Sequence, residues 1–360
     1  MEWKTVVLTV LIVSLCFFAV PIRVGPNTSD QDLKLFKNYV IRFNKSYRHN
    51  PEEYDKRFQR FQRSLQHIDK MNRLRSSDTS AFYGLTQFSD LTEEEFLTLH
   101  LRPDISVRSA KHLINPHSLN RHSEKSDSKS VLGRMKRANG IPTKFDWRNK
   151  GVVTPVKAQG SCGACWAFST VEVAEAMFAI QNGSLYSFSV QEMIDCAANG
   201  NYGCEGGDIC SLLTWLAGAK IKILPETTYP LTRSTDACKL ERTVSKDSGV
   251  IITDFACDNF MGAEDELLES IATHGPVAVA VNALSWQNYL GGVIQFHCDG
   301  AFSSLNHAVQ IVGYDNSAAT PFYIVRNSWG TVFGDKGYLY IAIGNNMCGI
   351  ANQVSSMDVI

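Results

Sequence analysis

The chain has 360 residues, of which 44% are apolar, and this is enough to bury a core and too apolar for a disordered protein. Its 35 basic and 36 acidic side chains leave a formal net charge of −1, so there is no overall positive field to hold nucleic acid or an anionic membrane. Any partner must therefore be selected by local features.

The first 20 residues are typical of a signal peptide. Lys4 precedes a nearly unbroken apolar run to Val20, which is short for a membrane span. A signal anchor is the alternative interpretation. We expect residues 1–20 to direct secretion. Triplets of the N-x-Ser/Thr type are glycosylation candidates on that route, and they begin at Asn27, Asn44 and Asn182.

Two segments with different patterns follow the signal peptide. Between residues 31 and 75, apolar residues recur at steps of three and four, which predicts two helices with one buried face each. Residues 101–137 are polar and lack this period, which predicts a flexible linker. The linker ends in "RMKR", and we interpret this basic run as a processing site after Arg137 and not only as a solvated charge run.

The pattern changes after residue 140. A helix is predicted from close to Cys165 to Gly183, and "QEMIDCA" and "SLLTWLAGA" are typical of shorter helices. From about residue 250 the apolar runs are rich in β-branched and aromatic residues, which predicts strands in "GVIITDF", "PVAVAVNA", "HAVQIVGY", "PFYIVRNSWG" and "GYLYIAI". One half is predicted to be mainly helical and the other mainly β.

The cysteines suggest one chemically distinct sulfur. Nine follow the signal peptide, and an odd number in an oxidising compartment is most simply four disulfides and one remaining thiol. Cys162 and Cys165 alone would also fit a redox pair or half of a zinc site, but no second close Cys/His pair is present. Cys165 is in the first turn of its predicted helix, where the helix dipole favours a thiolate. It is the candidate nucleophile.

Four other side chains could complete a nucleophilic site around Cys165. A thiolate needs a proton partner and a group that orients this partner, and His307 and Asn327, each next to a predicted strand, are the candidates. Trp329 could shield their hydrogen bond from water. Gln159, shortly before Cys165, could donate an amide N–H to a developing oxyanion.

These blocks resemble a known family. "QGSCGACWAF", "CEGGD", "NHAVQIVGY" and "RNSWG" are similar to the four signature blocks of papain-like cysteine peptidases. The resemblance covers residues 31–100 and 141–360, and the front half matches the family's inhibitory propeptide at Glu53, Arg57, Phe61, Ile68, Asn72, Gly84, Phe88 and Asp90. It implies an α+β, papain-like two-domain fold with a helical left domain, a β-barrel-like right domain and the active-site cleft between them, preceded by a helical inhibitory propeptide.

The resemblance also implies the organisation and activity of the chain. We expect a signal peptide (1–20), a propeptide (21–137, with an inhibitory domain at about 31–100 and a linker at 101–137) and a mature peptidase (138–360). The expected activity is that of a cysteine endopeptidase zymogen without metal or organic cofactor, lysosomal or secreted, and acting in protein turnover. Whether a convertase or the peptidase itself cuts at Arg134–Arg137 stays open.

Expected partners are protein and peptide substrates, the chain's own propeptide and cystatin-type inhibitors. We expect a monomer without nucleic acid and without stable membrane insertion.

Two rival interpretations are a non-enzymatic binding protein on the same fold and an exopeptidase. The intact set of Cys165, His307 and Asn327 argues against the first. The lack of a histidine-bearing insertion between residues 196 and 273 argues against the second.

The resemblance further assigns disulfides and a substrate pocket. The implied disulfides are Cys162–Cys204, Cys196–Cys238 and Cys298–Cys348. Cys210 and Cys257 are extra to this pattern, and either a fourth bridge or two reduced thiols is possible. The implied substrate-binding residues are Gly206, Gly207, Asp208, Ile209, Ala280, Leu305, Asn306, Ala308 and Gln353. This pocket is mainly apolar, so we expect Leu, Val or Phe over Arg one residue before the cleavage-site residue.

Overall fold

The computed structural model describes residues 28–102, 105, 140–240 and 249–360. The predicted signal peptide, Asn27, most of the predicted linker and Arg137 lie outside the described residues. The described chain divides into two compact units, one ending at Gln62 and the other spanning Arg63–Ile360.

The first unit contains helix α2 (Thr28–Arg42), a 3-10 turn (Ser46–His49) and the beginning of α3 (Pro51–Arg73). Its core is aromatic: the ring of Phe36 lies 4.9 Å from that of Tyr54 and 5.1 Å from that of Phe61, between centroids. Phe36 and Phe61 are both fully buried. The apolar spacing that predicted two helices is therefore confirmed, because these rings project from one face of each helix.

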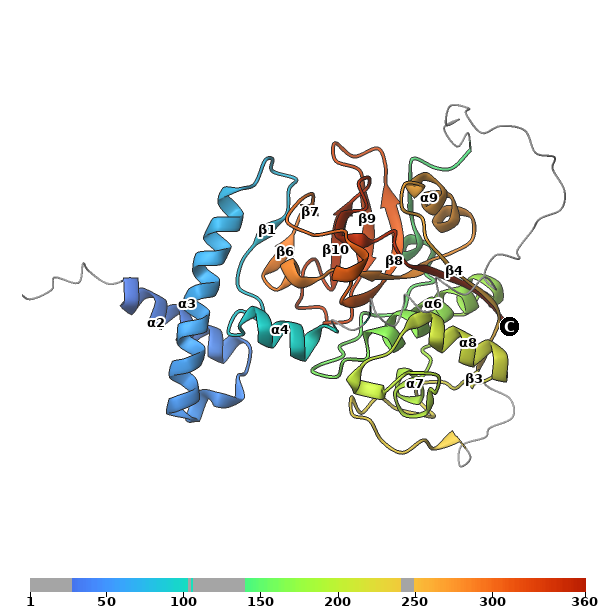
Figure 1. The fold of residues 1–360 in the computed structure, drawn as a ribbon, viewed down its shortest axis with the longest axis horizontal. Helices are drawn as coiled ribbons and strands as arrows, with labels where there is room; N and C mark the ends of the chain where they lie inside the picture. The colour runs from blue at the N-terminus through green and yellow to red at the C-terminus, as the bar shows by residue number, and fades with distance from the viewer. Residues whose placement is uncertain (1–27, 103–104, 106–139, 241–248) are drawn as a thin grey trace, which may run out of the picture. The chain divides into compact units, whose positions relative to one another are not determined.

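The second unit contains the remaining helices and all described strands (Figure 1). Its helices after α3 are α4 (Glu93–His100), α6 (Cys165–Asn182), α7 (Val190–Cys196), α8 (Ile209–Ala219) and α9 (Glu264–Thr273). Its strands are β1 (Phe82–Tyr83), β2 (Lys144–Asp146), β3 (Lys222–Ile223), β4 (Val250–Asp258), β5 (Val277–Val281), β6 (Tyr289–Gly291), β7 (Val293–Ile294), β8 (His307–Asp315), β9 (Phe322–Arg326), β10 (Tyr338–Ala342) and β11 (Val354–Val359).

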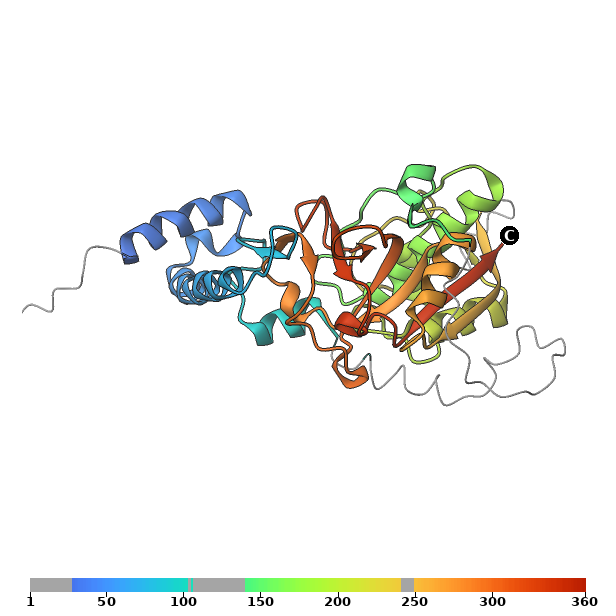
Figure 2. The same ribbon diagram turned by 90° about the horizontal axis from the view of Figure 1, so that it is seen from above.

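Nine of these strands form one sheet in the order β3-β4-β11-β5-β8-β9-β10-β7, with β2 paired to β8. Figure 2 shows the red strand β11 running to the chain end beside the orange strands. The expected barrel-like right domain is corrected in one respect. Among the described strands the sheet stays open, because the end strands β3 and β7 are two residues each and do not pair with one another.

Helix α6 forms the centre of the second unit. It is buried on almost every side, from Cys165 to Ala179, and it contacts α7, α8, β8 and β11. Its end is set by Gly183, whose φ of 71° is the left-handed conformation that a C-terminal glycine adopts without strain. The predicted helix bounds at Cys165 and Gly183 are confirmed.

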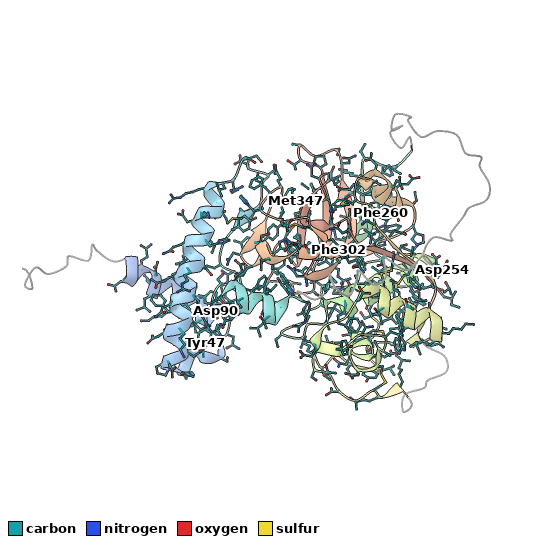
Figure 3. The ribbon with its side chains drawn as sticks, viewed as in Figure 1. Tyr47, Asp90, Asp254, Phe260, Phe302 and Met347 are labelled. Atoms are coloured by element: carbon teal, nitrogen blue, oxygen red, sulfur yellow. A yellow bond between two sulfur atoms is a disulfide. The ribbon has the colours of Figure 1, made fainter. Side chains whose placement is uncertain are left out.

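Two hydrophobic cores lie on either side of the sheet strands near α6. Alternate residues of β5 face different cores: Val277 and Val279 join the core shared with α9, whereas Ala278 and Ala280 join the core of α6, α7 and α8. We call these parts the sheet lobe and the helical lobe. In Figure 3, Phe260 and Met347 pack against the core of the sheet lobe, and Phe302 against that of the helical lobe.

The five predicted strand runs correspond to β4, β5, β8, β9 and β10, and the prediction is confirmed. Helix α4 and strands β1 and β11 were not predicted. In the described part of the chain, no helix combines the length and the apolar composition needed to cross a bilayer.

Candidate active site

Cys165 is the first residue of α6 and is fully buried. The preceding residue, Ala164, offers no side-chain cap, so the first N–H groups of the helix are not neutralised by a side chain. The helix dipole therefore acts on the sulfur position and favours an anion there. Of the cysteines that the structure describes, Cys165 is the one outside the disulfides.

His307 and Asn327 come from two neighbouring antiparallel strands of the sheet lobe. His307 begins β8, and Asn327 follows the last residue of β9. Nε2 of His307 donates a 2.8 Å hydrogen bond to Oδ1 of Asn327. The backbone N–H of Ser328 donates to the same oxygen at 2.8 Å, so the orientation of the Asn327 amide is fixed.

This bond determines which nitrogen of the ring can accept a proton. Because Nε2 carries a hydrogen, Nδ1 of the neutral imidazole is the acceptor. Nδ1 of His307 is buried and has no hydrogen-bond partner among the described residues. The ring therefore has an unused base on the side opposite Asn327.

Aromatic rings enclose the His307–Asn327 pair. The ring of Trp329 stacks on His307 at 4.8 Å between centroids, and Trp286 lies edge-on at 6.1 Å. Burial lowers the pKa of His307 to about 4, the hydrogen bond to Asn327 opposes this shift, and the nearby charge of His100 adds to it. His307 is therefore neutral in this form of the protein.

Gln159 is held by hydrogen bonds at both ends of its amide. Its Nε2 donates to the Cys162 carbonyl at 3.0 Å, and its Oε1 accepts from Oγ of Ser328 at 2.6 Å. The amide has a second hydrogen on Nε2 that can serve a developing oxyanion. Ser328 was missed in the sequence, where its only signal is its position next to Asn327.

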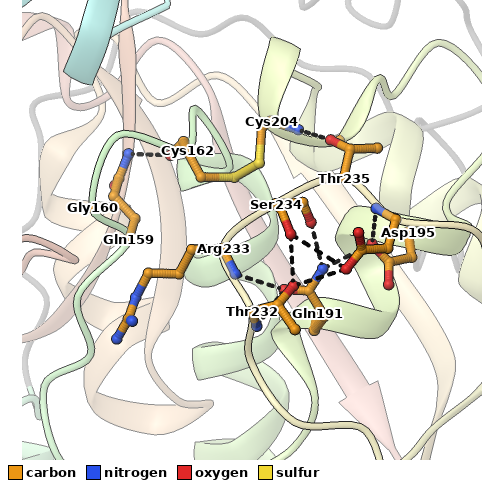
Figure 4. The surroundings of a disulfide bond; sticks show 12 residues. Gln159, Gly160, Cys162, Gln191, Asp195, Cys204, Thr232, Arg233, Ser234 and Thr235 are labelled. Carbon is orange, nitrogen blue, oxygen red and sulfur yellow. Dashed lines mark hydrogen bonds between the residues drawn. A yellow bond between two sulfur atoms is a disulfide. The ribbon is translucent and has the colours of Figure 1, made fainter.

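The disulfide Cys162–Cys204 fastens the loop before α6 to the glycine turn (Figure 4). The backbone N–H of Cys204 also binds Oγ1 of Thr235 at 2.9 Å. Within the turn, a side chain at Gly207 would collide with Trp166. Gly207 is thus required for packing, beside any role in binding a substrate backbone.

The three other cysteine pairs among the described residues are also joined by disulfides. Cys196–Cys238 lies in the helical lobe and Cys298–Cys348 in the sheet lobe, as the resemblance implied. Cys210 and Cys257, for which two states were open, form a fourth disulfide.

Residues 87–102 and Ile105, which we call the covering segment, lie over this site. Phe88 and Phe96 contact the ring of Trp329 edge-on at 5.2 and 5.5 Å. Arg102 donates its backbone N–H to the Asn306 carbonyl at 2.6 Å and its Nη2 to the Cys204 carbonyl at 2.5 Å. The sequence did not single out Arg102, because an isolated arginine carries no motif.

Four of the predicted pocket residues are brought together in the core of the helical lobe. These four residues are apolar and buried; they are Ile209, Ala280, Leu305 and Ala308. The same core also includes Ile105 of the covering segment. Gln353 donates to Oδ2 of Asp208 at 3.1 Å. The side chain of Asn306 bonds to the backbone of Ala283 and thus also supports the loop it belongs to.

No cluster of three or more His, Cys, Asp or Glu side chains in the described part of the chain could hold a metal ion. The chemistry that these residues can perform is that of a thiol activated by a helix start, a neutral imidazole base and an amide donor.

Comparisons with known proteins agree with this chemistry. Residues 141–357 match the papain family cysteine protease domain, and residues 36–96 match the cathepsin propeptide inhibitor domain. The chain belongs to the papain family of cysteine proteases and is a zymogen with a propeptide.

Individual relatives extend over most of the chain. Cathepsin O of Homo sapiens is 40% identical over 301 residues, 83% of this chain and 87% of that protein. Cysteine proteinase A of Leishmania mexicana is 34% identical over 361 residues, 98% of this chain and 94% of that protein. Among solved structures, the digestive procathepsin L2 proteinase from Tenebrio molitor larval midgut has a TM-score of 0.74 and 30% identity, covering 91% of this chain and 99% of that one.

Proposed function

We propose that residues 138–360 form an endopeptidase in which Cys165 is the nucleophile and His307 the acid and base. The observation that carries this proposal is the bond from Nε2 of His307 to Asn327, which leaves Nδ1 as a buried base with no described partner. A thiol at the start of α6 is the kind of group that such a base activates.

The reaction follows in two balanced steps. Nδ1 of His307 takes the thiol proton, and the Cys165 thiolate adds to the scissile carbonyl carbon. The imidazolium then returns the proton to the leaving amine as the C–N bond breaks, which leaves a thioester. Water gives a proton to Nδ1 and attacks the thioester, and the proton returns to the sulfur as the acid product leaves. Asn327 keeps the ring in the orientation that both steps need.

The oxyanion of each tetrahedral intermediate is held by Nε2 of Gln159 and the backbone N–H of Cys165. The amide of Gln159 is already oriented by Cys162 and Ser328, so no reorganisation is needed when charge develops.

The pocket is formed by Ile209, Ala280, Leu305 and Ala308. It binds the substrate side chain that lies one residue before the residue whose carbonyl is attacked. Ile105 packs in the same apolar core, which supports an aliphatic occupant over a charged one.

The organisation of the chain is part of the proposal. Residues 1–20 are a signal peptide and 21–137 a propeptide that ends at Arg137. The zymogen reaches the lysosome or the exterior, the mature enzyme is a monomer, and cystatin-type inhibitors bind its cleft. Asn44 and Asn182 are exposed, which supports them as glycosylation sites.

The test compares the processed wild-type enzyme with Cys165→Ala and Cys165→Ser. A thiol-directed epoxide should label the wild-type protein at Cys165 and neither variant. Hydrolysis of an internal bond in a peptide blocked at both ends should fall by roughly 10⁴-fold or more in both variants. Labelling of Cys165→Ala at another sulfur would refute the assignment, and a requirement for an unblocked peptide end would make the enzyme an exopeptidase.

A further inference from the structure

The fourth disulfide, Cys210–Cys257, joins a helix of the helical lobe to the nine-stranded sheet. Cys210 is the second residue of α8 in the helical lobe, and Cys257 belongs to β4 of the nine-stranded sheet. Ile209, the residue before Cys210, is one of the apolar residues of the candidate pocket.

The sulfur atoms of this bridge belong to a buried polar network. Nε2 of Gln353 donates to Sγ of Cys210 at 3.3 Å, and Oγ of Ser355 lies 3.5 Å from Sγ of Cys210 and 3.6 Å from Sγ of Cys257. Ser355 pairs directly with Cys257 in the ladder of β11 and β4. Cys210, Gln353 and Ser355 are each at most 2% exposed. The bridge thus joins the helix that carries Ile209 to β4, and β4 pairs with β11, the strand that follows Gln353.

The same network fixes the amide of Gln353. Its Nε2 also donates to Oδ2 of Asp208, whose Oδ1 caps the N–H of Ser211 at the start of α8. Because a carboxylate oxygen accepts only from the nitrogen of the amide, the positions of N and O in Gln353 are determined. Oε1 of Gln353 is buried and lacks a partner among the described residues.

We propose that the Cys210–Cys257 disulfide determines the selectivity of the substrate pocket by tethering its wall, Ile209, to its floor, Gln353. The pocket assignment rests on the proposed function. With the bridge intact, α8 is fixed to β4 and, through the β4–β11 ladder, to the strand after Gln353. Wall and floor then stay together, and the pocket admits a compact aliphatic side chain better than a wide ring. Without the bridge, the first turn of α8 and β4 are joined only by packing and hydrogen bonds, and the pocket can widen. Cys210 and Cys257 are positioning residues.

The matched control is the disulfide Cys196–Cys238. The two bridges close loops of 47 and 42 residues, so their removal relieves nearly the same constraint on the unfolded chain. Cys196 and Cys238 lie outside the pocket. A general loosening of the enzyme would therefore affect both double variants alike, whereas the proposal predicts a difference between them.

The experiment measures kcat and KM of the processed enzyme on two peptides that differ only in Val or Phe before the cleavage-site residue. Active sites are counted by epoxide labelling of Cys165. In Cys210→Ala/Cys257→Ala the Val-to-Phe ratio of kcat/KM should fall at least fivefold, mainly through KM. In Cys196→Ala/Cys238→Ala it should stay within twofold of the wild-type ratio. An unchanged ratio in the first variant, or an equal change in both, would overturn the proposal.

A single substitution tests the same coupling if the double variant does not fold. Gln353→Met keeps the length of the side chain and removes its donor to Asp208 and Cys210, so the ratio should shift in the same direction with the bridge intact. An unchanged ratio would overturn the coupling through Gln353. Failure of the proposed function is distinguishable: in that case the wild-type enzyme is not labelled at Cys165, or its kcat/KM does not depend on the residue at this position.

Discussion

Oγ of Ser328 donates a 2.6 Å hydrogen bond to Oε1 of Gln159, and the backbone N–H of Gln159 donates to the Ser328 carbonyl at 2.8 Å. This double link connects the loop before α6 with the residue that follows Asn327. The proposed donor of the oxyanion site and the residue that orients His307 are therefore held in one unit, although they are far apart in the sequence.

We predict that Ser328→Ala lowers kcat about tenfold with little change in KM, a difference of about 1.4 kcal/mol in activation free energy. The reason is that Gln159 keeps its amide but loses one of the two hydrogen bonds that orient it. Removing the donor itself, in Gln159→Ala, should cost more, on the order of 10² to 10³ in kcat. In the Gln159→Ala background the Ser328→Ala change should have almost no further effect. Additive losses in steady-state kinetics would contradict the coupling.

A second prediction concerns Arg102, which binds the carbonyls of Cys204 and Asn306 beside the site. Arg102→Ala should raise the rate at which an epoxide labels Cys165 in the intact precursor at pH 7 by roughly tenfold, because the covering segment loses a charge-assisted hydrogen bond. The control is Arg73→Ala. Arg73 is exposed and pairs with Asp69 on the surface of α3, an interaction that contributes little. Equal labelling rates for Arg102→Ala and the wild-type precursor would argue against a covering role.

A third prediction follows from the low pKa of His307, about 4 in the covered site, for which burial is the main cause. In an uncovered, hydrated site its pKa should move toward the ordinary value near 6.5. Between these two values the uncovered form binds more protons, so acid shifts the equilibrium toward it. Labelling of the uncut precursor should therefore accelerate as the pH falls from 6.5 to 4. His100→Gln removes a charge that lowers this pKa, and it should make the dependence shallower. A labelling rate that does not change over this range would exclude the mechanism.

A fourth prediction concerns the stability of the mature enzyme. Burial raises the pKa of Glu192 to about 7, and the bond from the Leu224 N–H opposes this shift. Since the unfolded chain loses this proton near 4.5 and the folded chain near 7, stability contributed by Glu192 is complete below 4.5 and is lost as the pH rises to 7.

The melting temperature should accordingly be higher at pH 5 than at pH 7.5. Glu192→Gln should reduce this difference, whereas Glu266→Gln, which changes an exposed carboxylate, should leave it as in the wild type. If Glu192→Gln keeps the full pH dependence, another group is responsible.

The sequence alone allowed the elements with strong local patterns to be predicted. The apolar residues of α6 and its final Gly183 indicated a helix with the bounds observed, and the β-branched runs indicated β5, β8 and β9. Strand β11 was missed because "VSSMDV" alternates apolar and polar side chains only weakly, and its conformation depends on pairing with β4 and β5. A two-residue strand such as β1 has no local signal at all.

Residue types and their order along the chain were sufficient to indicate the family and to propose a nucleophile and its base, because Cys165, His307 and Asn327 each lie in a distinctive block. The sequence did not show which residues lie close together in space. The link from Ser328 to Gln159, the contact of Arg102 with Cys204 and the pairing of Cys210 with Cys257 all join segments that are remote in sequence. Such contacts depend on how the sheet packs against α6, α7 and α8, and packing is a property of the whole folded chain that no local window of sequence contains.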